Sequence, residues 1–118
     1  MPYPRTFSEE IKEGDYNFTV TLFEVENAAI VLFNEKGRMR LGTLAVAMPH
    51  FKGGPCISSV LLGERNMIVT KVLAERLSAH FNRIVLVSTH LKEVKEDVMG
   101  SVLMRLTQRL LDKIKKNQ

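Results

Sequence analysis

Three segments of this 118-residue chain predict strands that are apolar on both faces. Residues 28–33 and 44–48 are continuously apolar, and residues 83–88 are apolar at all positions except the first and the last. Strands of this kind are normally covered on both sides of their sheet. The chain offers only two long amphipathic helices as cover. The small number of helices that can cover the sheet is therefore the strongest constraint on how this sequence can fold.

The remaining patterns predict the order of the elements. Tyr16, Phe18, Val20 and Leu22 alternate with polar residues, as in a strand that is buried on one face. Short polar turns connect this strand to 28–33 and then to a third strand over about 38–48, which indicates an antiparallel meander. The rest of the chain predicts a strand over 56–62, a helix that Asn66 can cap and Asn82 ends, a strand over 83–88 and a helix from about Asp97.

These elements predict an α+β fold with a mostly antiparallel sheet in the order β-β-β-β-α-β-α. Two helices packed about 10 Å apart cover roughly one face of a five-stranded sheet whose strands are about 4.8 Å apart. One helix on each face would leave both faces thinly covered, so we expect both helices on one face. The other face would then be apolar and exposed, which soluble monomers avoid. We expect it to be used for dimerisation by stacking on a partner's sheet, with Leu44, Val46 and Met48 in the interface.

The first residues differ in composition from the rest of the chain. Pro2 and Pro4 disfavour regular structure, and Gly14 marks a break. Phe7 and Ile11 have the spacing of one turn that docks on the body. The sequence predicts an N-terminal tail over 1–14 and one domain over 15–118.

No residue pattern predicts catalysis, a cofactor or a metal. Gly63 ends a strand before a helix that contains Thr70 and Lys71, but the second glycine of a phosphate-binding loop is missing and Glu64 would repel phosphate. The three histidines and the single Cys56 lack the spacing of metal ligands. We therefore expect that the protein is not an enzyme.

The formal net charge of +4 raises the question of whether the protein binds nucleic acid. Arg105, Arg109 and Lys113 recur at helical spacing, but no aromatic residues interleave with them, and such a row more often marks a solvated helix face. We expect no nucleic-acid or membrane partner. One cysteine and the absence of an apolar leader in MPYPRTFSEE suggest the cytoplasm, with the nucleus as a second location.

Four short motifs in order resemble one known family. They are LAVAM at 44–48, S-x-LLG at 59–63, T-x-x-LAxRL at 70–77 and VLVS at 85–88. From about Tyr16 to the final helix, the chain is similar to the proteasome assembly chaperone 4 family. The resemblance implies a small non-catalytic α/β protein that pairs with the related assembly chaperone 3, sheet against sheet. It also implies that the pair holds proteasome α subunits while the α-ring of the 20S particle assembles, and leaves before the particle matures.

The sequence leaves three hypotheses. The first is such a chaperone, paired with a related chaperone or with itself. The second is a roadblock-like or longin-like dimerising scaffold, and the third is a small basic nucleic-acid-binding protein. Under the first hypothesis, the candidate contacts for a protein partner are Arg38, Arg40, Glu64, Arg65, Arg105 and Arg109.

Overall fold

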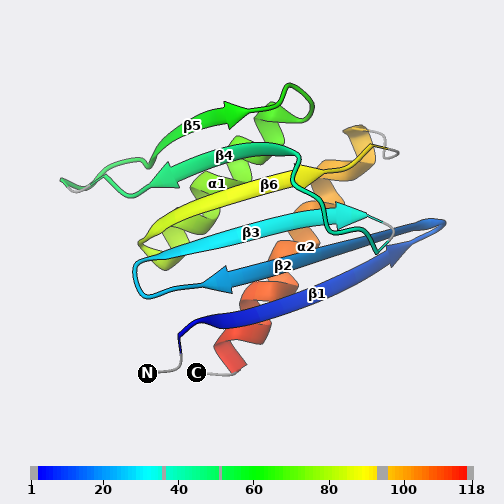
Figure 1. Cartoon of the computed structure of the whole chain (residues 1–118), viewed down its shortest axis with the longest axis horizontal. Helices are drawn as coiled ribbons and strands as arrows, with labels where there is room; N and C mark the ends of the chain where they lie inside the picture. Colours follow the sequence, from blue (N-terminus) through cyan, green and yellow to red (C-terminus); the bar gives the residue numbers. More distant parts are fainter. Residues whose placement is uncertain (1–2, 36, 51, 93–95, 117–118) are drawn as a thin grey trace.

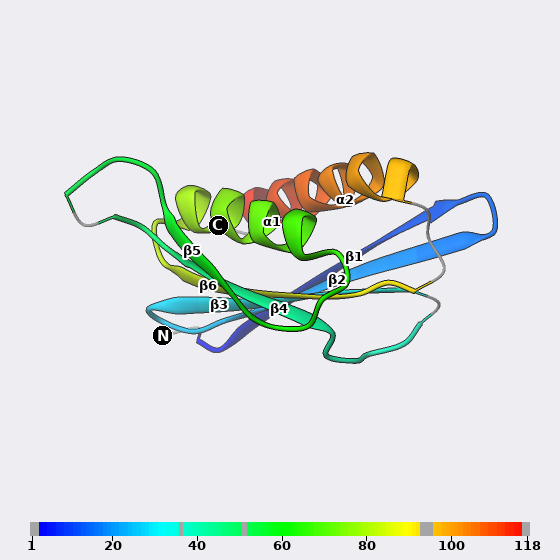
Figure 2. The same cartoon turned by 90° about the horizontal axis from the view of Figure 1, so that it is seen from above.

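The computed structural model describes residues 3–35, 37–50, 52–92 and 96–116. One mixed sheet of six strands, in the order β1-β2-β3-β6-β4-β5, carries both helices on the same face (Figures 1 and 2). The predicted α+β class and the placement of two helices on one face are confirmed. The elements are β1 (Arg5–Glu13), β2 (Tyr16–Glu24), β3 (Ala28–Glu35), β4 (Thr43–Met48), β5 (Ile57–Leu62), α1 (Met67–Phe81), β6 (Ile84–His90) and α2 (Glu96–Lys116).

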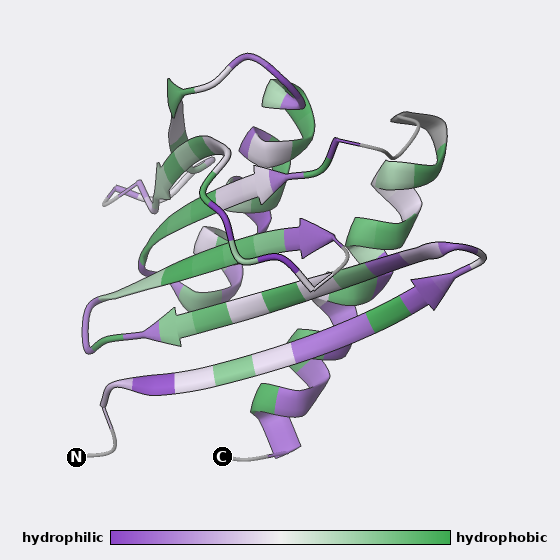
Figure 3. Ribbon diagram, turned by 45° about the vertical axis from the view of Figure 1, so that its right-hand side comes forward, coloured by the Kyte–Doolittle hydropathy of each residue, from purple (hydrophilic) through white to green (hydrophobic). Residues whose placement is uncertain are grey.

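Residues 5–13, expected in a tail, form the edge strand β1, which pairs antiparallel with β2. In this register Phe7 lies opposite Leu22, and Ile11 lies opposite Phe18. Both apolar residues face the helices, and Ile11 is buried in the core. The residues between them are polar, so β1 is largely hydrophilic (Figure 3). The spacing that suggested one helical turn is equally compatible with alternate positions along a strand.

The predicted three-stranded meander of the apolar strands is wrong in one respect. β3 does pair antiparallel with β2, but β6 lies between β3 and β4, parallel to β3 and antiparallel to β4. Strands that are separated by one neighbour lie about 10 Å apart, and a connection of seven residues, 36–42, is long enough to cross that gap.

The strand predicted over about 38–48 begins only at Thr43. Residues 38–42, which we call the strap, form no strand and cross the open face of the sheet, the face without helices (Figure 2). A Cβ atom at Gly42 would lie 2.1 Å from the carbonyl oxygen of Thr89, so only glycine permits this close approach.

The helices begin and end close to their predicted positions. Asn66 and Asn82 flank α1, and both adopt the left-handed conformation. The Asn66 side chain makes no capping hydrogen bond and instead donates to the carbonyl of Leu91. Within the part of the chain that the structure describes, neither helix has the length and apolarity to cross a membrane. The core between helices and sheet includes Phe18, Phe33, Leu73, Leu77, Leu103, Leu106 and Leu110.

Candidate interaction surface

The open face of the sheet carries a continuous apolar row that crosses four strands. The cross-strand register places Ile30 of β3 opposite Phe23 of β2 and beside Leu86 of β6, and Leu86 lies opposite Val46 of β4. Phe23 and Ile30 remain 39% and 41% exposed. Cross-strand neighbours of this kind lie side by side on one face, so their exposed surfaces merge.

Two further rows run parallel to the first. Leu32 is followed across the sheet by Ser88, Leu44 and Leu62, and Ile84 lies near Met48, which is opposite Ile57. The predicted interface residues Leu44, Val46 and Met48 therefore all lie on the open face. The members of this face that keep more than a third of their surface exposed are Phe23, Ile30, Met48, Ile57, Leu62 and Ile84.

The same face is polar over β1 and most of β2. The β1 residues that alternate with Phe7 and Ile11 are exposed and hydrophilic: Thr6, Ser8, Glu10 and Lys12. On β2, Asn17, Thr19 and Thr21 continue this polar area, and a shallow hollow of about 440 Å³ separates part of it from the strap. The open face is thus divided into an apolar half over β3, β6, β4 and β5 and a polar half over β1 and β2.

The apolar half is contiguous across four neighbouring strands. Isolated apolar side chains are common on protein surfaces, but contiguous apolar patches mark interaction sites. The shape of the open face favours one kind of partner. A twisted sheet face is matched best by another sheet that packs about 10 Å away.

The six candidate contact residues do not form one site. Arg38 and Arg40 are exposed on the strap. Arg105 and Arg109 lie on α2 and contact β1: Arg105 pairs with Glu13 at 3.2 Å, and Arg109 Nη1 donates to the Glu10 carbonyl at 3.0 Å.

Glu64 and Arg65 lie in the connection between β5 and α1. Arg65 Nη2 donates to the carbonyl of Lys92 at 2.6 Å, and its own carbonyl accepts from the Thr43 hydroxyl. Arg65 therefore ties this connection to β4 and to the segment after β6. Both residues remain exposed, and their role in partner contact stays a prediction.

A groove between the first turns of the two helices was not predicted. It encloses about 550 Å³ and is lined by Glu64, Met67, Ile68, Val72, Met99 and neighbouring residues. Ile68 is 81% exposed, the highest value among the large exposed apolar residues of the described chain. The signal in the sequence was that Met67 and Ile68 are apolar yet lie off the core-facing stripe of the helix. The groove lies on the helix layer, away from the open face.

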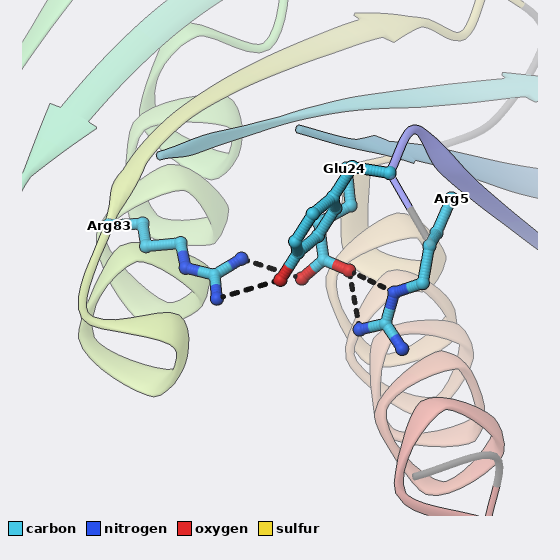
Figure 4. Close-up of polar contacts among 4 residues, drawn as sticks. Arg5, Glu24 and Arg83 are labelled. Carbon is cyan, nitrogen blue, oxygen red and sulfur yellow. Dashed lines mark hydrogen bonds and ion pairs between the residues drawn. The ribbon is translucent and has the colours of Figure 1, made fainter. Parts of the chain in front are cut away.

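A partly buried charged cluster is centred on Glu24 (Figure 4). The Glu24 side chain is 4% exposed; its Oε1 lies 2.5 Å from Arg5 Nη2, and its Oε2 lies 2.9 Å from Arg83 Nη1. Arg83 Nη2 also donates to the Tyr3 hydroxyl at 3.3 Å. This hydrogen bond, joined by the attraction of Glu24, raises the pKa of Arg83 against the opposing effect of partial burial. The cluster joins the start of β1, the end of β2 and the start of β6, which is a structural role.

The described residues contain no group of three or more histidine, cysteine, aspartate or glutamate side chains that is placed to hold a metal ion. Cys56 has a free thiol that donates to the Glu75 carbonyl at 3.6 Å. The features that stand out on the described residues are the exposed apolar side chains of the open face and of the helix layer.

Comparison with known proteins gives results of three kinds. The sequence model of the family described as "Proteasome assembly chaperone 4" matches residues 15–91. A search of curated proteins found no match. Among solved structures, the fold is similar to a chain of the "Crystal Structure of a Novel Chaperone Complex for Yeast 20S Proteasome Assembly", with a TM-score of 0.71, 17% identity and 95% of each chain covered. At this identity, the structural similarity concerns the fold.

Proposed function

The chain belongs to the proteasome assembly chaperone 4 family, and we propose that it binds proteasome α subunits while the α-ring of the 20S proteasome is assembled. The family match over residues 15–91 is the observation that carries this proposal. The family consists of non-catalytic assembly chaperones, so the chain is not an enzyme. Its mechanism is one of templating: it holds a subunit transiently and is released when later subunits compete for the same surface.

We propose further that the protein acts as a dimer through the apolar half of its open face. The support is the apolar row of Ile30, Leu86 and Val46, in which Ile30 is exposed and the other two are half-buried. A partner sheet stacked on this face would remove them from water and leave the helices of both chains outside. The partner in this proposal is a related assembly chaperone of the same fold, or a second copy of this chain.

The family assignment favours the chaperone hypothesis over the other two. A roadblock-like or longin-like scaffold would share the sheet with helices on one face, and the described fold alone does not separate the two. A nucleic-acid-binding protein would need free cations along one surface. Arg105 and Arg109, the basic row that raised this hypothesis, instead contact Glu13 and Glu10 of β1.

Affinity purification from the organism that encodes the chain tests the proposal. A tagged chain at native expression level is expected to co-purify with proteasome α subunits and with a second small α+β chaperone, identified by mass spectrometry. The complexes should be smaller than the complete 20S particle on a density gradient. Recovery of only unrelated proteins would contradict the chaperone function. Fractionation of the same cells tests the proposed location in the cytoplasm and nucleus.

A further inference from the structure

The strap covers one end of the open face. Asn34 of β3 and Ser88 of β6 both point to this face, yet they are 1% and 0% exposed. They are buried because the strap lies over them: the backbone N–H of Arg40 donates to Asn34 Oδ1 at 3.0 Å, and that of Gly42 donates to Ser88 Oγ at 2.9 Å. The strap therefore stands above the sheet where β3 and β6 end (Figure 1).

These contacts fix the strap in place. Two buried polar side chains hold two of its backbone N–H groups, and Asn34 Nδ2 also approaches the Met39 sulfur at 3.8 Å. Gly42 packs against the backbone of Thr89 more closely than any residue with a side chain could. A segment anchored by buried hydrogen bonds presents its remaining side chains in a defined position.

The side chains that the strap presents are apolar. Met39 is 58% exposed and Leu41 is 59% exposed, although their backbone is held against the sheet. Met39 lines the hollow beside Thr19 and Thr21 of the polar half. Two residues after Gly42 the chain reaches Leu44, which lies on the apolar half of the open face. The anchored strap therefore carries two large exposed apolar side chains across the open face, from the polar half to the edge of the apolar half.

We propose that the strap is a ledge of the dimer interface: Met39 and Leu41 contact the end of the partner's sheet and fix how far it slides along β3 and β6. The inference rests on the proposed pairing through the open face. The occupant is the sheet face of a second chain of this fold, because four strands of six to eight residues present a flat area of roughly 300–400 Å². That area is far wider than an extended peptide, and the ledge extends it toward the roughly 800 Å² that each partner contributes to a standard interface.

The ledge also explains how a flat apolar face selects one arrangement of the two sheets. Stacked apolar sheets have few directional contacts, so their relative position is weakly determined by the flat surfaces alone. The polar half over β1 and β2 limits the partner on one side. The ledge limits it at the end of β3 and β6, so a partner must match both boundaries, which makes the strap a determinant of partner choice.

Site-specific cross-linking tests the inference in the full chain. The photoreactive residue benzoylphenylalanine is placed at Leu41, Val46 or Ile68 in cells of the encoding organism. Leu41 and Val46 are expected to cross-link to the same chain of this fold, with the Leu41 adduct mapped to the end of a strand in that chain. Ile68, on the helix layer, should not cross-link to it.

Each other outcome is decisive. If Val46 captures a chain of this fold but Leu41 captures nothing or another protein, the ledge is overturned and the proposed pairing stands. If neither position captures such a chain, the proposed pairing fails as well. Capture of the same chain at Ile68 would show that the reaction does not report proximity on the open face, and would overturn the inference.

A matched pair of double variants gives an independent measurement. Met39→Ser with Leu41→Ser is expected to weaken pairing with the captured chain roughly tenfold or more, because two apolar side chains leave the interface. Met67→Ser with Ile68→Ser removes similar side chains from the helix layer and should leave that affinity unchanged. Equal affinities of the two variants, both shown to be folded by denaturation, would overturn the inference.

Discussion

Glu24 at the end of β2 and Arg83 just before β6 are 59 residues apart in the sequence, yet they form a partly buried ion pair at 2.9 Å. Glu24→Gln removes the charge that two guanidinium groups share. We expect a loss of about 2 kcal/mol in the free energy of unfolding, since both arginines stay partly buried without a counter-charge. Urea denaturation measures this, with Glu26→Gln in the exposed β2–β3 turn as the control. A change of less than 0.5 kcal/mol, the range of ordinary surface substitutions, would contradict the role of the cluster.

The raised pKa of Arg83 has a defined consequence for how the stability of the protein depends on pH. Stabilisation from a group whose pKa is raised by folding is fully present below its unfolded pKa and is lost only as the pH rises through the folded value. For arginine that window lies above about pH 12. The destabilisation caused by Arg83→Met is therefore expected to be constant between about pH 6 and 9. Thermal melts across this range measure it, and a slope in the difference between variant and parent would contradict the assignment.

Val46 lies near the centre of the apolar half, so Val46→Asp should prevent pairing. A carboxylate buried against a partner sheet would be desolvated without a counter-charge, and we expect the affinity to fall at least a hundredfold. Thr19→Asp, on the polar half of the same face, is the control and should pair normally. Light scattering and co-purification report the assembly, and circular dichroism reports the fold. A variant that keeps its partner would argue against this interface.

Gly42 and Gly100 should respond in opposite directions to the same substitution. Gly42→Ala places a Cβ atom 2.1 Å from the Thr89 carbonyl oxygen, so the strap must move, with an expected loss of about 1–3 kcal/mol. A Cβ atom at Gly100, within α2, meets nothing within 4 Å. Alanine there should stabilise the protein by about 0.5–1 kcal/mol through its helix propensity. Chemical denaturation compares them, and a neutral Gly42→Ala would mean that the strap is not held closely.

The contacts between α2 and β1 are expected to hold that edge strand in place. Arg109 and Lys113 donate to the carbonyls of Glu10 and Ser8, at 3.0 and 2.8 Å. Replacing both with alanine should raise amide exchange in β1 by roughly three- to tenfold, as expected for a few exposed polar contacts. Exchange in β3 and β6 should not change. Uniform acceleration across the sheet would indicate global destabilisation instead.

Periodicity predicted the helices and the central strands. It also predicted which residues of the sheet face the helices. Val69, Leu73 and Leu77 recur at helical spacing and are all on the covered side of α1. Leu44, Val46 and Met48 were placed on one face by their alternation, which the strand β4 confirms. Whether that face binds a partner stays a prediction.

What could not be predicted depends on contacts between distant segments. β1 carries only Phe7 and Ile11 as apolar positions, so its strand character depends on the core residues of β2 and on α2. The strap was expected to extend a strand because Met39 and Leu41 alternate with arginines, and its course is fixed by Asn34 and Ser88 from other strands. Glu24 continues the core-facing alternation of Phe18, Val20 and Leu22, but its partners Arg5 and Arg83 lie 19 and 59 residues away in the sequence, so the pattern alone did not predict the cluster.

The central position of β6 affects the order in which the protein can form during synthesis. β1, β2 and β3 are hydrogen-bonded to one another, and β4 and β5 form a separate pair. Among the described residues, these two groups are connected only through β6, which follows the other five strands in the sequence. Until β6 has been synthesised, the inner edge of each group lacks its partner strand, and unpaired edges of this kind pair wrongly with other chains. A protein that assists the assembly of others thus passes through an interval in which it is itself prone to misassembly.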